Sequence, residues 1–269
     1  MTEQATVVYA DILGFSALVL SMPSSIDRLD GSYHSAMSRA QLRKSIKEER
    51  LDQLERTFVV FHRTLDLRVS ELVNVDPLQS IVFSDCAYVV FRDPNMATYF
   101  AQAFMRDLIS FRVPARMGIG RGTFRGLRFA TDTSEVTRHS SQFLGTGVIR
   151  AHQAESCGLE GLRIFIHTDS EMKEDWPGDL CIVADETTQK TAPPVTLELN
   201  YLEHYPDFTP TPEGAQTTDE AYGEIVTAVT EMMGASPEGE RAHYRRTLDA
   251  LARMRDAYKQ HIPPPSQAQ

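Results

Sequence analysis

The stretch VVYADILGFSALV, residues 7–19, combines the pattern of a buried strand with a carboxylate in this 269-residue chain. Its first residues, Val-Val-Tyr, are typical of a buried β-strand, yet the strand ends in Asp11. The chain then continues through Gly14 into further apolar residues. A carboxylate among apolar neighbours is costly to bury unless a cation or hydrogen-bond donors meet it. The stretch therefore predicts a strand whose terminal carboxylate requires a positive partner.

The composition is that of an acidic globular protein. Apolar residues make up 42% and charged residues 24% of the chain, and the formal net charge is −10. This acidity argues against nucleic acid or an anionic membrane as the main partner. Three scattered cysteines without CxxC spacing, no membrane-length apolar run and no leader-like start predict a reduced, cytoplasmic protein.

Helix and strand patterns follow the first strand. Apolar spacings of three and four predict one long helix from Ser35 to about Val75. The segment SIVFSDCAYVVF, residues 80–91, predicts a hairpin with a polar tip at Ser84 and Asp85. A second helix is expected to begin at Pro94 and to reach about Phe111.

The next third of the chain predicts the rest of a sheet. We expect a glycine-rich strand over residues 114–130, a short helix over residues 145–158, and three strands at GLRIFIHT, DLCIVAD and VTLELNY. The order β-α-β-β-α-β-β-α-β-β-β is typical of an α+β protein with helices on one antiparallel-rich sheet, related to the ferredoxin-like plan.

The composition changes after this region. PDFTPTPEGAQTTDE is rich in proline, threonine and acid and predicts a linker, and two helical patterns follow, over about residues 219–233 and 238–261. We expect residues 1–205 to form one domain, 206–262 to form the linker and C-terminal helices, and 263–269 to be a disordered tail.

Two carboxylates carry the predicted chemistry. Asp11 ends the first strand and Asp85 lies at the hairpin tip, so the two are neighbours if the strand pairs with the hairpin. Close carboxylates are ligands for hard divalent cations, and two such ions suit in-line attack on phosphorus. The alternative is that each aspartate is only a helix-cap or turn residue.

Four segments resemble the class III nucleotide cyclases. YADILGFSALV is similar to the opening motif of that family, IVFSDCAYVVF to its metal-binding hairpin, ARMGIGRG to its arginine-containing strand, and FLGTGVIRAHQAES to its asparagine-containing helix. They follow the family's order over roughly residues 5–202. The resemblance implies a class III cyclase-like sandwich with a mainly antiparallel sheet, a ferredoxin-like βαββαβ core and a C-terminal helical addition.

The resemblance also implies a metal site. Asp11, Asp85 and the carbonyl of Ile12 would bind two divalent cations, Mn²⁺ or Mg²⁺, and both aspartates would be catalytic. Such ions activate the ribose 3′-hydroxyl of a nucleoside triphosphate and stabilise the pyrophosphate leaving group.

Phosphate contacts are implied for three further residues. Gly14 and Phe15 would offer backbone N–H groups to the terminal phosphates, and Arg116 would bind phosphate oxygens with its guanidinium group. For Arg116 an alternative remains open, namely a pairing with a surface acid.

Two positions depart from the pattern of the purine cyclases. Ile81 stands where those enzymes hold a base-reading lysine, and Gln142 stands at a second base-reading position. A pocket without those donors and acceptors does not favour adenine or guanine. The chain is similar instead to a bacterial branch, the Pycsar cyclases, that makes cyclic UMP or cyclic CMP for antiphage defence. UTP or CTP is therefore the expected substrate, with UTP preferred.

The helix after Gly145 also departs from the family. Ile149 and Gln153 stand where the family holds its ribose-orienting asparagine and its transition-state arginine. Arg150 and His152 are close enough along the helix to substitute, and Arg150 is predicted to be catalytic together with Asp11 and Asp85. The alternative is that both face solvent.

Class III cyclases work as dimers, which implies a homodimer of this chain with active sites at the interface. The predicted function is a pyrimidine nucleotide cyclase. Two alternatives are an adenylyl or guanylyl cyclase with an atypical base pocket, and a catalytically silent nucleotide sensor.

Overall fold

The computed structural model describes residues 3–28, 38–48, 51–72, 77–132, 137–168, 181–184, 195–202 and 218–261. The elements in chain order are β1 (Glu3–Ile12), α1 (Phe15–Ser21), η1 (Pro23–Arg28), α2 (Arg39–Glu48), α3 (Gln53–Leu72), β2 (Pro77–Val82), β3 (Cys86–Phe91), α4 (Pro94–Ser110), β4 (Ala115–Asp132), β5 (Thr137–Leu144), α5 (Thr146–Glu155), β6 (Ile164–His167), β7 (Cys181–Val183), β8 (Val195–Leu199), α6 (Thr218–Ala235), η5 (Glu238–Glu240) and α7 (Arg241–His261). This confirms the predicted α+β class.

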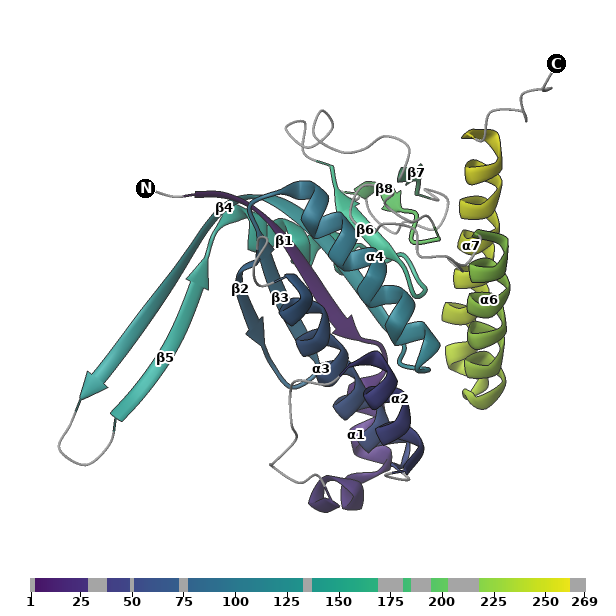
Figure 1. Cartoon of the computed structure of the whole chain (residues 1–269), viewed down its shortest axis with the longest axis horizontal. Coiled ribbons are helices and arrows are strands. Elements are labelled where there is room, and N and C mark those ends of the chain that lie inside the picture. The colour runs from purple at the N-terminus through teal and green to yellow at the C-terminus, as the bar shows by residue number, and fades with distance from the viewer. Residues whose placement is uncertain are drawn as a thin grey trace.

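One mixed sheet organises these elements. Its strand order is β2-β3-β1-β4-β6-β8-β7, with β5 paired to β4. Among the described pairs, β4 and β6 run parallel and the others run antiparallel. The first four strands and the helices between them give the ferredoxin-like order β4-β1-β3-β2, as predicted. Figure 1 shows β4 and β5 continuing away from the body as a long hairpin.

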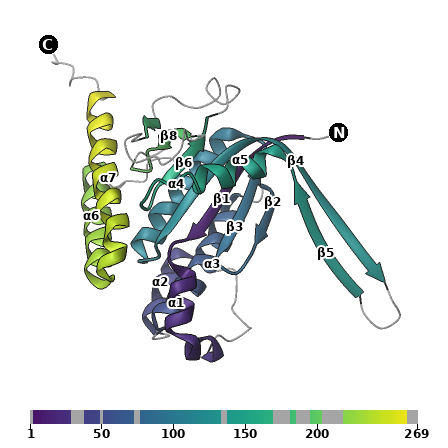
Figure 2. The ribbon, with the colours of Figure 1, turned by 180° about the vertical axis from the view of Figure 1, so that it is seen from behind.

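The alternation of side chains along β1 separates two faces of the sheet. Val8, Ala10 and Ile12 are buried with residues of α3 and α4 in the main core. Val7 and Tyr9 belong to a second, smaller cluster with Ala151 of α5. The two views in Figures 1 and 2 accordingly show α3 and α4 on one side of the sheet and α5 on the other. Asp11 shares the face of Val7 and Tyr9.

Glycines let α5 lie directly on β4. A Cβ atom at Gly118 would lie 2.0 Å from the carbonyl oxygen of Ala151, and one at Gly120 would lie 2.3 Å from the Ala151 nitrogen. Gly122 lies equally close, because its Cβ would be 2.3 Å from Oγ1 of Thr146. Every second residue of this part of β4 is therefore without a side chain on the face that α5 covers.

The prediction of one long helix between Ser35 and Val75 was wrong. The structure has two helices, α2 and α3, and α3 begins after a capping box. The Asp52 carboxylate accepts a hydrogen bond from the Glu55 amide at 3.0 Å, and the Glu55 carboxylate accepts one from the Asp52 amide at 2.9 Å. This reciprocal pair satisfies free N–H groups at a helix start, so the chain begins a new helix there.

The two C-terminal helices pack on the main core. Leu251 and Met254 of α7 are 0% exposed and belong to the same apolar cluster as Val8 of β1. The hydroxyl of Thr247 accepts a hydrogen bond from the Leu162 amide at 2.8 Å, which joins α7 to the segment before β6. Most of the predicted linker segment 206–220 and the tail over 263–269 lie outside the described residues, while residues 218–220 begin α6. The division into domains stays a prediction.

None of the described helices combines the length and the apolar character that crossing a membrane requires.

Candidate metal centre

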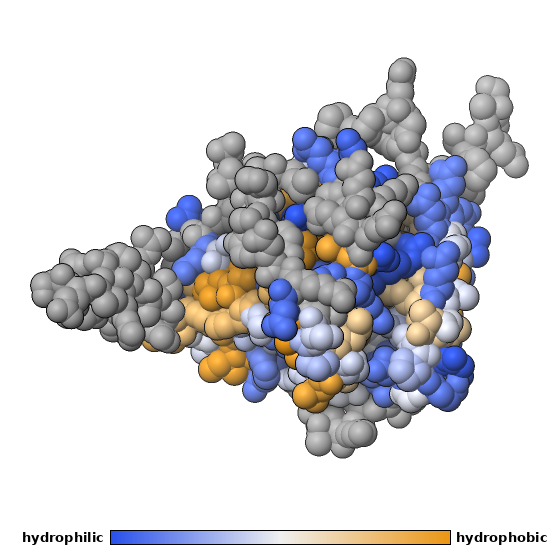
Figure 3. Space-filling model, turned by 90° about the horizontal axis from the view of Figure 1, so that it is seen from below, coloured by the Kyte–Doolittle hydropathy of each residue, from blue (hydrophilic) through white to orange (hydrophobic). Residues whose placement is uncertain are grey.

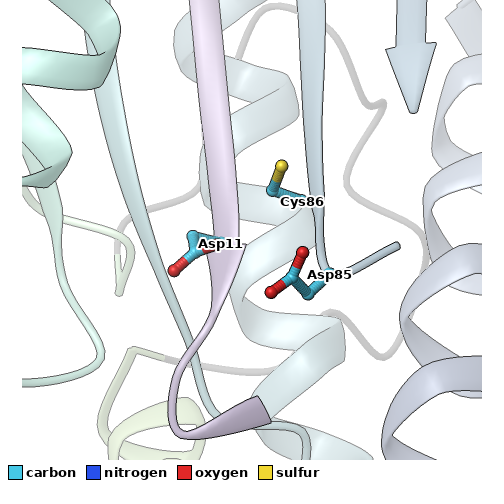
Figure 4. A group of neighbouring side chains, drawn as sticks. All are labelled: Asp11, Asp85 and Cys86. Atoms are coloured by element: carbon cyan, nitrogen blue, oxygen red, sulfur yellow. The ribbon is translucent and has the colours of Figure 1, made fainter. Parts of the chain in front are cut away.

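Strand pairing brings the two predicted aspartates together. Asp11 pairs with Cys86 of β3 on one side and with Arg116 of β4 on the other. One ligand atom each of Asp11, Asp85 and Cys86 lies within 4.8 Å of the others. Figure 4 shows Asp11 on β1 beside Asp85, which precedes β3. All three side chains are partly exposed, so the group is open to an ion from solvent.

Backbone and hydroxyl hydrogen bonds fix the turn that carries Asp85. The Ile12 amide donates to the Asp85 carbonyl at 2.9 Å, and the Phe83 amide donates to the Cys86 carbonyl at 2.8 Å. The Ser84 hydroxyl donates to Oδ1 of Asp85 at 2.9 Å. The hairpin tip is thus tied to the end of β1, and the Asp85 carboxylate is oriented by its neighbour.

The environment of Asp11 disfavours its negative charge. Burial raises the pKa of Asp11 to about 7, and the nearby carboxylates of Glu155 and Asp85 act in the same direction. The Arg116 guanidinium and a hydrogen bond from Tyr9 lower this pKa, but they do not outweigh the other effects. Three carboxylates therefore share one close guanidinium, and a divalent cation would relieve the excess negative charge.

Arg116 is paired with an acid in this structure. Its Nε atom donates to Oε1 of Glu155 at 2.7 Å, its Nη2 atom lies 2.6 Å from the same oxygen, and its Nη1 atom donates to the Leu159 carbonyl at 3.1 Å. For Arg116 the sequence left open two roles, namely phosphate binding and pairing with an acid on the surface. Glu155 is instead 4% exposed and lies on the last turn of α5.

Gly14 and Phe15 lie where the metal centre meets α1. Gly14 has a φ of 72°, a backbone conformation that favours glycine, and precedes the first residue of α1. The Phe15 ring stacks on Phe58 of α3 with the ring centroids 5.9 Å apart. The structure thus places both residues directly after β1, and their predicted phosphate contacts stay predictions.

The structure does not bring Arg150 to the two aspartates of its own chain. Its Nη1 atom donates to the Arg121 carbonyl at 2.7 Å, and it packs beside Gly120 of β4. Gly120 pairs with Val7, four residues before Asp11, which is about 13 Å along a strand. His152, the other candidate substitute, is exposed and lies against Tyr9 with the ring centroids 5.4 Å apart.

The predicted base-reading positions adjoin a cluster of aromatic rings. Ile81 pairs with Tyr88 of β3, and Gln142 belongs to β5, where its backbone pairs with Leu127. The ring centroid of Tyr88 lies 4.5 Å from that of Tyr9 and 5.2 Å from that of Phe143. The rings occupy the same face of the sheet as Asp11.

This face also exposes apolar side chains. Phe83 is 48% exposed beside the aromatic cluster, and Ile149 is 58% exposed on α5. Seen from below, the space-filling view shows apolar residues at several places among hydrophilic ones (Figure 3). On this face α5 covers the glycines of β4, whereas Phe83 stays exposed beside the aromatic cluster.

Three residues near the centre were missed by the sequence analysis, namely Cys86, Glu155 and His62. Cys86 is the first residue of β3 and pairs with Asp11, so the two side chains lie on the same face of the sheet. The alternation of side chains along a strand could have indicated this. Glu155 follows Ala151 by four residues, so it shares the face of α5 that lies on the glycines. Nothing in the sequence marks His62.

The donor set fits a hard divalent cation. Two partly exposed carboxylates from adjacent segments converge, and carboxylate oxygens are the ligands that Mg²⁺ and Mn²⁺ prefer. The Cys86 thiol is a softer donor, and burial raises its pKa. The side chains present therefore agree with the predicted metal type, with Asp11 and Asp85 as the ligands.

Comparison with known proteins finds similar solved structures only. No protein-family model matches the chain, and no curated protein matches its sequence. The chain is similar to a guanylyl cyclase structure (15% identity, 74% of this chain and 94% of that chain, TM-score 0.42), to a bacterial light-regulated adenylyl cyclase (13%, 85% and 58%, TM-score 0.47) and to the adenylyl cyclase CyaB from P. aeruginosa (20%, 74% and 94%, TM-score 0.41). The function is therefore argued from the site itself.

Proposed function

We propose that this chain is a nucleotide cyclase that converts UTP or CTP to the 3′,5′-cyclic nucleotide and pyrophosphate. The observation that carries the proposal is the convergence of Asp11 and Asp85, whose ligand atoms lie within 4.8 Å of each other in surroundings with excess negative charge. Divalent cations held there would activate the 3′-hydroxyl and stabilise the leaving pyrophosphate. The resemblance of four ordered segments to class III cyclases supports the same chemistry.

The chain's own residues have distinct tasks in this proposal. Asp11 and Asp85 hold the cations, with the Ile12 carbonyl beside them. Gly14 and Phe15, directly after β1, contact the triphosphate through their backbone N–H groups. Arg116 uses the N–H groups that Glu155 and Leu159 leave free to bind a phosphate oxygen.

A pyrimidine base fits the apolar character of the base-reading region. Ile81 offers no hydrogen-bond donor, and Tyr88 and Phe143 lie close to it. Such surroundings hold a base by stacking and give little discrimination by hydrogen bonding to purine edges. The cyclic product would serve as a second messenger, which the resemblance to antiphage cyclases supports.

The active unit in this proposal is a homodimer. Exposed Phe83 and Ile149 lie on the face that carries Asp11, and an apolar surface of this kind favours association of two copies. In such a dimer Arg150 of one protomer could reach the metal site of its partner, which it does not reach in its own chain. An isologous two-fold contact would give two equivalent sites.

A turnover assay tests the proposal. Purified protein with Mn²⁺ is incubated separately with ATP, GTP, CTP and UTP, and each product is identified by mass. Cyclic UMP or cyclic CMP is the expected product. A cyclic purine nucleotide would instead identify an adenylyl or guanylyl cyclase with an atypical base pocket. Nucleotide binding without any product would favour the silent sensor and contradict the proposed reaction.

A further inference from the structure

We propose that His62 of α3 is a positioning residue that holds the Asp85 turn in its metal-binding geometry. The inference rests on the proposed function, because it assigns an outer support to that same metal centre. Its basis is a set of contacts that join α3 to the two turns on either side of the centre.

The first contact is a hydrogen bond to the hairpin tip. The Nε2 atom of His62 lies 3.0 Å from the carbonyl oxygen of Ser84, the residue directly before Asp85. Because a carbonyl oxygen can only accept, Nε2 must carry the hydrogen. The same Ser84 orients the Asp85 carboxylate through its hydroxyl at 2.9 Å. His62 thus fixes the peptide unit from which the metal ligand extends.

Aromatic contacts fix the imidazole ring itself. The centroid of the His62 ring lies 4.4 Å from that of Phe58 and 5.3 Å from that of Phe61. Both pairs are edge-to-face. Phe58 also stacks on Phe15, which begins α1 directly after β1. One turn of α3 therefore contacts the hairpin tip through His62 and the start of α1 through Phe58.

These contacts also affect the geometry of the metal ligand Asp85. The turn is short and is exposed at Phe83 and Ser84, and a backbone hydrogen bond from Ile12 joins it to β1. Metal ligands need outer hydrogen bonds to keep their oxygens in place, and loss of such a bond typically weakens metal binding by 10–100-fold. The Ser84 hydroxyl supplies such a bond to the Asp85 carboxylate, and the Nε2 donor of His62 holds Ser84 in place.

Two substitutions separate the donor from the ring. His62→Phe keeps an aromatic ring against Phe58 and Phe61 but has no donor, whereas His62→Gln keeps an N–H donor but has no ring. Mn²⁺ affinity of the full chain is measured by isothermal titration calorimetry with the metal alone, after thermal unfolding has shown that each variant is folded. Ser70→Ala, two turns further along α3, is the control.

The expected result is Mn²⁺ affinity about tenfold weaker in His62→Phe and within about threefold of the unsubstituted protein in His62→Gln and Ser70→Ala. Unchanged affinity in His62→Phe, or a loss confined to His62→Gln, would overturn the positioning role while leaving the metal centre in place. An unsubstituted protein that binds no Mn²⁺ would overturn the proposed metal centre and, with it, the role of His62.

Discussion

The Oε1 atom of Glu155 accepts a hydrogen bond from Nε of Arg116 at 2.7 Å and lies 2.6 Å from Nη2 of the same side chain. The guanidinium that stands opposite Asp11 is therefore already neutralised by a carboxylate from α5. Because of this pairing, Arg116 does not cancel the charge of Asp11 and Asp85. Carboxyl groups therefore outnumber the available cationic groups at the metal centre although an arginine lies beside it.

Glu155→Gln should weaken metal binding and lower stability. The freed guanidinium would turn its charge toward Asp11 and compete with a cation, so we expect Mn²⁺ affinity to fall about tenfold, an effect of about 1.4 kcal/mol. The partly buried Arg116 also loses its ionic partner, which should cost about 2 kcal/mol of unfolding free energy. Calorimetric Mn²⁺ titration and thermal unfolding measure the two effects. Glu71→Gln, at a 42% exposed partner of Arg68, is the control and should leave both almost unchanged.

Asp11→Ala and Asp85→Ala should each abolish cyclic nucleotide formation while the fold remains. Removing either carboxylate takes away a metal ligand, and the loss of several kcal/mol of transition-state stabilisation should lower turnover by about 100-fold or more. Product analysis by mass and circular dichroism are measured in parallel. Asp249→Asn, at an exposed acid of α7, should retain activity. Collapse of the fold in both alanine variants would show that the carboxylates are structural.

The stability of the metal-free protein should depend on the charge of Asp11. Burial raises the pKa of this carboxyl from 3.8 to about 7, so the folded state binds a proton that the unfolded state releases between these values. The contribution of Asp11 to stability is therefore fully present below about pH 4 and is lost as the pH rises through 7. We expect Tm, measured in chelator, to rise from pH 8 to pH 6, and this part of the rise to vanish in Asp11→Asn. Identical pH profiles for the two proteins would contradict the prediction.

The sequence predicted the frame of the site better than its side-chain partners. Short runs of β-branched and aromatic residues predicted the first strand and the hairpin, and their pairing brings Asp11 to Asp85 as expected. The pairing of Arg116 with Glu155 joins residues 39 apart in the chain, and no local periodicity contains it. The helix α3 begins where it does because of hydrogen bonds between Asp52 and Glu55. The spacing of apolar residues does not predict such polar contacts.

Gly120→Ala should destabilise the protein. The new Cβ atom would lie 2.3 Å from the backbone nitrogen of Ala151, so α5 must move away from β4. Overpacking of this kind costs about 1–3 kcal/mol. Gly223→Ala in α6 is the matched control, because nothing lies within 4 Å of its new methyl group. That change should instead stabilise the protein by about 0.4–1 kcal/mol, as thermal or urea unfolding can measure.

Leu251→Ala should reveal how far the C-terminal helices contribute to the core. Leu251 of α7 is 0% exposed, so the substitution should cost about 2–5 kcal/mol of unfolding free energy. Leu20→Ala, at a leucine that is 82% exposed in α1, should change stability by less than about 0.5 kcal/mol. Equal stability of the two variants would mean that α7 is an appendage that the rest of the fold does not need.

The position of α7 in the core affects how the protein matures during synthesis. Leu162 donates its amide hydrogen to Thr247, 85 residues later, and the apolar cluster that contains Val8 is completed by Met254. Until α7 has been synthesised and can pack, the sheet that carries Asp11 and Asp85 lacks part of its support. Because contacts so distant in sequence form late, the metal centre should mature only after α7 has emerged from the ribosome.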